Sequence, residues 1–137
     1  MLKKLDGIIG EIAEIVMAFA RVRKEFGDTE RLYILEIVVD DIIVYKVGKA
    51  SGHSSKKRML QIVESYFDMY RVTPVIKIVK DREVTEVFTK ETKCHNELKE
   101  WQFVPVKKFS GSTELFNVTK EKVLEVYEDV LQGIKRG

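Results

Sequence analysis

Two short apolar runs separated by an acidic pair are the feature of this sequence that most limits its fold. Leu32 to Val39 and Ile42 to Val47 are dominated by Ile, Val, Leu and Tyr, which suit a pleated, half-buried surface, and the pair Asp40-Asp41 lies between them. The pattern predicts two antiparallel strands joined by a tight turn. Because side chains alternate along a strand, Tyr33 and Lys46 are expected to share one face of this hairpin.

A loop and a helix follow the predicted hairpin. We expect the second strand to end at Gly48, because glycine adopts backbone angles closed to other residues or lets a ligand come close. Ser54 and Ser55 are alternative caps for the next helix, about Ser55 to Tyr70, which places Arg58 in its first turn or two. The residues that this helix is expected to bury are Met59, Leu60, Ile62, Val63, Tyr66 and Phe67.

Positive charge is concentrated around this loop. The net charge of +2 permits a nucleic-acid partner without arguing for one, so the distribution of charge is more informative than the sum. Such basic runs also occur at ordinary solvated helix starts. The cluster consists of Lys46, Lys49, Lys56, Lys57 and Arg58.

The chain length and composition predict one globular domain over residues 1–137. A length of 137 residues can bury a single core, and 45% hydrophobic with 34% charged residues is unlike a disordered tail. Cys94 is the single cysteine, which excludes an internal disulfide and a cysteine-based zinc site within one chain, and favours a reducing, cytoplasmic location. We find no apolar run that predicts a membrane span and no signal-peptide pattern.

Helical and extended patterns alternate along the rest of the chain. Apolar residues at helical spacing predict an N-terminal helix, Leu5 to Phe26 within residues 1–28, and a last helix, about Thr119 to Ile134 within residues 117–137. Extended segments are expected at Thr73 to Val79, where Pro74 indicates a strand start or an edge, and at Thr113 to Val118.

A third predicted helix, about Arg82 to Trp101, carries two polar residues on its apolar face. Glu91 and His95 are four residues apart, and they share that face with Val84, Val87, Phe88, Leu98 and Trp101. A buried carboxylate needs a cation, a hydrogen-bond donor or a water-lined cleft. The alternative is a slightly rotated helix with both residues at the solvated border, and spacing alone favours this alternative.

Five short motifs in a fixed order resemble the GIY-YIG nuclease superfamily. They are Tyr33 in the first strand, Lys46-Val47-Gly48 in the second, Arg58 at a helix start, Glu91 with His95, and Gly111-Ser112-Thr113-Glu114-Leu115-Phe116. The sequence is most similar to the phage and viral branch, which has a Lys-Ile-Gly type second motif and a Glu-x-x-x-His pair. The resemblance spans residues 31–116.

The resemblance implies an α+β fold and a DNA-cutting enzyme. The fold would be a small three-stranded antiparallel sheet flanked by helices, to which the N- and C-terminal helices are added. The activity would be endonucleolytic hydrolysis of DNA phosphodiester bonds with one divalent ion, Mg²⁺ or Mn²⁺, because a hard ion prefers carboxylate ligands and acts as a Lewis acid.

The resemblance also carries roles over to single positions. It implies that Glu91 is the metal ligand and that Arg58 holds phosphate, since a guanidinium binds phosphate oxygens by a planar fork. Tyr33 is implied to activate the attacking water, and His95 to contact phosphate or position water. Lys46 stands where many relatives have a second tyrosine.

The sequence departs from the family pattern in both tyrosine motifs. Arg31 and Leu32 replace the first two residues of the first triplet, so that only Tyr33 remains. Tyr45 is an alternative to Lys46, although it lies one residue out of register and is expected to face the other side of the strand.

Other residues and functions complete the expectations. Glu114 is expected to hold a loop, and Cys94 to be packed or semi-exposed rather than reactive. Two further functions stay open: an inactive DNA-binding module on the same scaffold, and a protein-interaction domain, including a homodimer, that pairs through a terminal helix. The side chains expected to contact DNA are Lys49, His53, Lys56 and Lys57.

Overall fold

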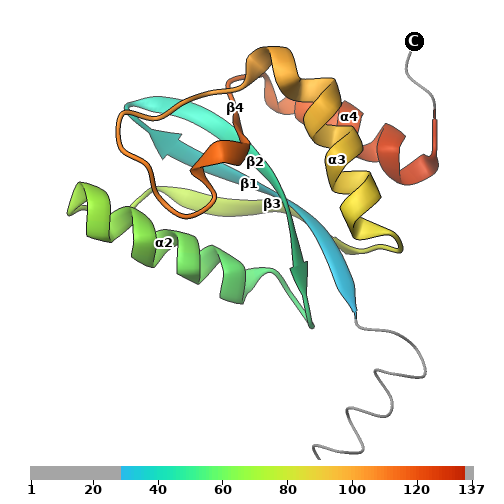
Figure 1. Cartoon of the computed structure of the whole chain (residues 1–137), viewed down its shortest axis with the longest axis horizontal. Helices are drawn as coiled ribbons and strands as arrows, with labels where there is room; N and C mark the ends of the chain where they lie inside the picture. Colours follow the sequence, from blue (N-terminus) through green and yellow to red (C-terminus); the bar gives the residue numbers. More distant parts are fainter. Residues whose placement is uncertain (1–28, 135–137) are drawn as a thin grey trace, which may run out of the picture.

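The computed structural model describes residues 29–134, and Figure 1 shows their arrangement. Four antiparallel strands form one sheet in the order β3-β1-β2-β4. The α+β class is confirmed, and the sheet has a fourth, two-residue strand beyond the three that the resemblance implies, within the extended segment predicted at Thr113 to Val118. The predicted N-terminal helix lies outside the described residues. The elements are β1 (Glu30–Val39), β2 (Ile42–Ser51), α2 (Lys56–Tyr70), β3 (Ile76–Glu83), α3 (Val87–Leu98), η1 (Lys99–Trp101), η2 (Ser112–Glu114), β4 (Leu115–Phe116) and α4 (Lys120–Gln132).

The β1–β2 hairpin forms as predicted, and the acidic pair builds its turn. Val39 pairs with Ile42, so that Asp40 and Asp41 are the two loop residues. Their φ angles of 50° and 64° lie in the left-handed region, which aspartate tolerates better than most residues. The Asp40 carboxylate accepts a hydrogen bond of 3.1 Å from the Tyr70 hydroxyl, which ties the turn to the end of α2.

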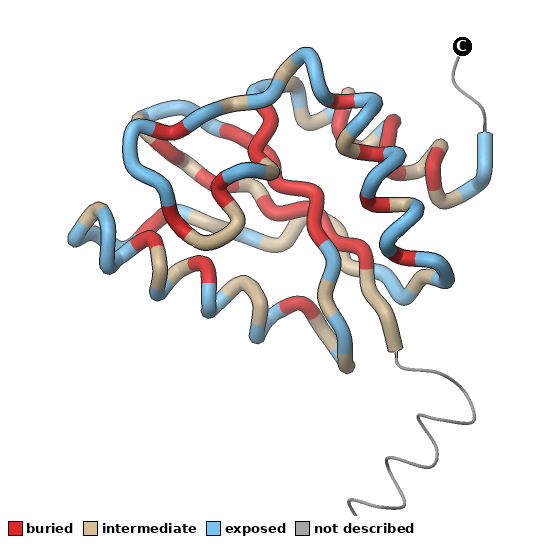
Figure 2. The backbone as a smooth tube through the Cα atoms, in the orientation of Figure 1, coloured by how far each residue is buried: buried red, intermediate tan, exposed pale blue. Residues whose placement is uncertain are grey.

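Helices cover both faces of the sheet. Helix α2 packs on one face, and α3 and α4 pack on the other (Figure 1). Figure 2 shows that the longest buried stretches belong to the two central strands, β1 and β2. The buried residues on the α2 face are Tyr33, Leu35, Ile37, Val39, Val44, Ile62, Tyr66, Phe109 and Leu115. Those on the α3–α4 face are Leu32, Ile34, Tyr45, Val47, Val87, Cys94, Leu98, Phe116, Val123, Val126, Tyr127 and Val130.

Strand β3 and helix α3 begin later than the sequence pattern predicts. The strand spans Ile76–Glu83 instead of Thr73 to Val79. Its pairing with β1 starts at Ile76, opposite Ile37, and continues to Glu83, opposite Arg31. The predicted helix start at Arg82 is therefore wrong, and α3 begins at Val87.

Several apolar residues expected in the core are exposed. On α2, Leu60 and Phe67 expose 61% and 44% of their surface, and on α3 Phe88 exposes 67%. The prediction that these side chains are buried is wrong because each helix packs along a narrow side. Helix α2 buries only Ile62 and Tyr66 among its described residues.

Candidate active site

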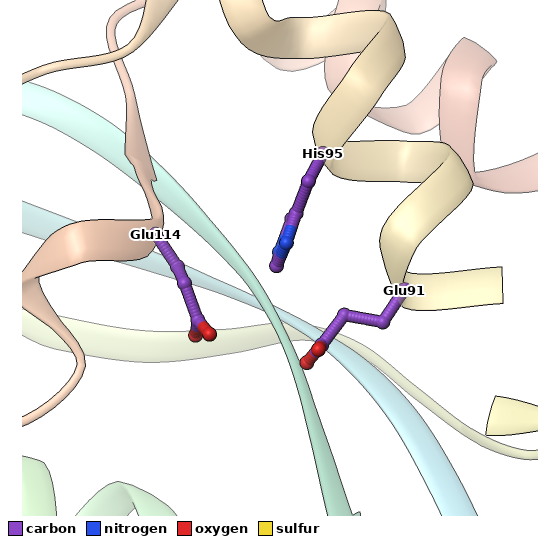
Figure 3. Close-up of side chains that lie close together, drawn as sticks. All are labelled: Glu91, His95 and Glu114. Atoms are coloured by element: carbon purple, nitrogen blue, oxygen red, sulfur yellow. The ribbon is translucent and has the colours of Figure 1, made fainter. Parts of the chain in front are cut away.

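Two residues of α3 and one residue of the η2 turn form a cluster of ligand-type side chains. Glu91 and His95 project from successive turns of α3, and Glu114 ends η2. The three side chains point toward one another (Figure 3), and one ligand atom of each lies within 4.8 Å of those of the other two. Glu91 is buried, whereas His95 and Glu114 are half-buried. The alternative that placed both α3 residues at a solvated border is therefore wrong for Glu91.

The cluster lies where the edge of β2 is uncovered. Strand β4 pairs only with Tyr45 and Lys46, so β2 has no partner among the described strands on that side after Lys46. His95 Nε2 donates to the Val47 carbonyl oxygen at 2.6 Å, which holds α3 against this edge. Because a carbonyl only accepts, Nε2 carries the hydrogen, and Nδ1 has the free lone pair when the imidazole is neutral.

Lys46 reaches the cluster from the other face of the sheet. Its ammonium forms an ion pair with Glu114, although the Lys46 side chain is only 1% exposed. Burial lowers the pKa of Lys46, and the negative charge of Glu114 opposes that effect. Burial and the same negative charge raise the pKa of Glu91. Two neighbouring carboxylates in a site that excludes much of the solvent favour a cation between them.

Tyr33 is buried beside Lys46, on the same face of the hairpin as predicted. The Lys46 ammonium lies 5.9 Å from the centre of the Tyr33 ring. Tyr33 pairs with Gly48 across β1 and β2, and a Cβ at Gly48 would lie 2.4 Å from the tyrosine hydroxyl oxygen. The prediction that β2 ends at Gly48 is wrong, since the strand continues to Ser51. The missing side chain of Gly48 instead makes room for the phenol.

The Tyr33 hydroxyl is the polar atom of this region that the fold leaves unpaired. It is buried, and no described residue meets the geometry of a hydrogen bond with it, although the Arg58 guanidinium lies close enough to act on its pKa as a side-chain donor as well as by charge. Burial raises the pKa of Tyr33, and the positive charge of Arg58 opposes the rise. The phenol therefore keeps its proton at neutral pH.

Arg58 completes the cationic side of the site. It lies in the first turn of α2, as predicted, and its Nη1 donates to Ser110 Oγ at 3.1 Å. Gly111 has a φ angle of 83°, and a Cβ there would lie 2.9 Å from Lys46 Cε and 3.5 Å from Arg58 Nη2. The glycine turn before η2 therefore lies against both cations.

The predicted DNA-binding side chains divide into two groups. Lys49 lies on β2, directly after Gly48, and its positive charge lowers the pKa of Glu91 against the larger effect of burial. His53, Lys56 and Lys57 are exposed on the loop before α2 and on its first turn. Their contacts with DNA stay predictions.

Three further side chains that the sequence singled out lie in or near this region. Tyr45 lies on the opposite face of the sheet from Lys46, as its register predicts, and its hydroxyl donates to Glu36 at 2.8 Å. Glu114, which the sequence analysis expected to hold a loop, does pair with Lys46 but also belongs to the ligand cluster. No periodic pattern could reveal this, because Glu114 lies in an irregular segment far from Glu91 in the chain. Cys94 is fully buried in the core, as predicted.

The fold and the cluster define an α+β domain with a candidate metal-binding site at one sheet edge. The chain matches the T5orf172 domain over residues 30–131 and belongs to that family, which is part of a nuclease-related group of domains. No curated protein and no solved structure matches the chain. Within residues 29–134, every helix is too short or too polar to cross a bilayer.

Proposed function

We propose that this protein is a metal-dependent endonuclease of the GIY-YIG type that hydrolyses phosphodiester bonds in DNA. The observation that carries the proposal is the cluster of Glu91, His95 and Glu114, with Lys46 and Arg58 beside it. A cation site next to fixed positive charges suits an anionic phosphodiester. Membership of the T5orf172 domain family supports the same class of activity.

The donor set fits a hard divalent ion, Mg²⁺ or Mn²⁺. Glu91 and Glu114 offer the carboxylate oxygens that such ions prefer, and His95 offers an imidazole nitrogen that Mn²⁺ accepts readily. These three residues would hold the ion. When bound, the ion would supply Lewis-acid stabilisation of the negative charge that develops on the phosphoryl oxygens.

The residues around the cluster would bind the substrate and orient the water. Arg58 binds a phosphate oxygen by its planar guanidinium fork, and Lys46 neutralises charge next to it. Tyr33 orients the attacking water through its neutral hydroxyl, which needs a hydrogen-bond partner that the described fold does not supply. The unpaired phenol thus gains in the complex the hydrogen bond that it lacks in the free protein.

Cleavage of supercoiled plasmid and branched DNA in Mg²⁺ or Mn²⁺ tests the proposal. Glu91→Gln keeps the side-chain shape but removes the charge, and we expect cleavage to fall by about 10²–10³-fold, with EDTA abolishing it. Arg58→Ala should lose cleavage as well. Mn²⁺ binding, followed by electron paramagnetic resonance, should weaken in Glu91→Gln. The matched control is Glu64→Gln, a carboxylate exposed on α2.

The outcomes separate the proposal from its main alternative. Cleavage by Glu91→Gln at the wild-type rate would overturn the assignment of the site. The alternative, an inactive DNA-binding module, is motivated by the departures from both tyrosine motifs. It predicts salt-sensitive DNA binding without metal dependence and without cleavage products.

A further inference from the structure

A hollow lies where β1 begins, β2 ends and α3 begins. Its volume is about 350 Å³, which is near the lower end of the range for small-molecule pockets, about 300–1,000 Å³. Both polar and apolar surfaces line it. The lining residues are Glu30, Lys49, Ala50, Ser51, Val87 and Phe88.

The hollow presents an aromatic ring and a cation together. Phe88 is a large apolar side chain on α3, yet 67% of its surface is exposed. The Lys49 ammonium lies 4.6 Å from the centre of the Phe88 ring. Glu30 accepts a hydrogen bond of 3.4 Å from the Val87 backbone N–H, which places its carboxylate at the start of α3.

The hollow and the ligand cluster are adjacent parts of one surface. Phe88 lies three residues before Glu91, which is about one turn of α3, so the ring and the cluster are successive on the helix. Lys49 lines the hollow, and its charge also acts on Glu91. A strand of nucleic acid with one phosphate at the cluster would therefore pass its neighbouring nucleotide over Phe88.

We propose that this hollow binds an unpaired nucleobase next to the scissile phosphate, so that the preferred substrate is DNA with a single-stranded overhang, flap or branch. The inference rests on the proposed function. A base that has left its helical stack exposes a π face, which stacks on an aromatic ring whatever the sequence. Phe88 supplies that ring through the face that the Lys49 ammonium does not cover, Lys49 pairs with the flanking phosphate, and the Glu30 carboxylate accepts from an exocyclic amino group.

Binding to two DNA probes in EDTA, without cleavage, tests the inference. One probe is a duplex with a single-stranded overhang, and the other is the same duplex with blunt ends. We expect Phe88→Ala to lose about tenfold in affinity for the overhang probe and little for the blunt one, because stacking on one aromatic side chain is worth about that factor or more. Phe88→Tyr should retain the affinity. Leu60→Ala, a similarly exposed apolar residue on α2, is the control.

A cross-link provides a direct second readout. With 5-iodouracil placed at each overhang position in turn, irradiation should join one position to Phe88, as mapped by mass spectrometry, and that position should not cross-link in Phe88→Ala. Equal affinities of wild type and Phe88→Ala for the overhang probe, or an equal loss for both probes, would overturn the inference.

The failure of this inference is distinguishable from the failure of the proposed function. If wild type cuts DNA while Phe88→Ala binds the overhang probe normally, the nuclease stands and the base site is wrong. If Phe88-dependent binding is found but no DNA is cut, the hollow stands as a base-binding site of a DNA-binding module, and the nuclease is wrong. If the protein binds neither of the two probes, the base site is wrong.

Discussion

Two buried tyrosines on opposite faces of the sheet show how differently its two sides are built. Tyr127 of α4 is fully buried in the α3–α4 core, and its hydroxyl donates to the Leu32 carbonyl oxygen at 2.7 Å. Tyr33, the next residue of β1, is buried on the α2 face, and its hydroxyl has no partner among the described residues. A buried polar atom without a hydrogen bond costs about 1–3 kcal/mol. The α4 side is therefore optimised for stability, whereas the side that carries Tyr33 retains an unfavourable group.

The same contrast separates two carboxylates. Asp81 of β3 accepts hydrogen bonds from Arg31 Nε at 2.6 Å and from the Ser55 backbone N–H at 2.8 Å. Burial disfavours its charge, but these donors outweigh burial and lower the pKa of Asp81. Glu91 has a raised pKa, because burial and a neighbouring carboxylate disfavour its charge. Asp81 therefore has donors within the fold that favour its charge, whereas the surroundings of Glu91 disfavour its charge.

The largest expected effect is that of Tyr33→Phe on activity. Because this variant removes only an unpaired hydroxyl, we expect DNA cleavage to fall by about 10²–10⁴-fold while the free energy of unfolding stays constant or rises. Plasmid cleavage and urea unfolding measure the two quantities. A marked loss of stability would mean that the hydroxyl has a structural partner.

Gly48→Ala should have a smaller effect on cleavage than Tyr33→Phe, and it should also lower the stability of the fold. In Gly48→Ala the new Cβ would lie 2.4 Å from the Tyr33 hydroxyl oxygen, so the ring must move. We expect a loss of about 1–3 kcal/mol in stability together with reduced cleavage. In a Tyr33→Ala background the same Gly48→Ala change should cost less stability than in the wild type, because the ring that it displaces is absent, and neither Tyr33→Ala nor the double variant should cleave DNA. Wild-type cleavage by Gly48→Ala would contradict the placement of the phenol.

Tyr127→Phe is expected to affect stability alone. It removes the hydrogen bond to the Leu32 carbonyl, which contributes about 1 kcal/mol. The urea midpoint should fall with an unchanged slope, and cleavage below the unfolding transition should match that of the wild type. If cleavage falls as far as in Tyr33→Phe, the contrast between the two tyrosines is lost.

The smallest effect concerns the dependence of stability on pH. The pKa of Asp81 in the folded protein lies below its ordinary value of 3.8, so its ionised form stabilises the fold above that value, and this contribution is lost as the pH falls through the folded-state pKa. Asp81→Asn should therefore be about 1 kcal/mol less stable at pH 7, and the difference should shrink below about pH 4. Asp68→Asn, an exposed position on α2, is the control. A difference that is independent of pH would exclude this role of the charge.

The pattern of neighbouring residues in the sequence predicts part of this structure correctly. The alternation along β1 and β2 and the acidic pair between them predicted the hairpin, and the same alternation placed Tyr33 and Lys46 on one face and Tyr45 on the other. These properties depend only on neighbours in the chain. The start of α3 was mispredicted because cross-strand pairing with β1 decides where β3 ends.

The sequence by itself determined the hairpin, its turn, and the spacing that puts Glu91 and His95 on successive turns of one helix. Only the tertiary structure decided that these residues meet Glu114 at the uncovered edge of β2, and that Gly48 makes room for Tyr33. The physical reason is that periodicity constrains neighbours along a single element. Burial, desolvation and the approach of groups from opposite faces of a sheet depend on how the elements pack.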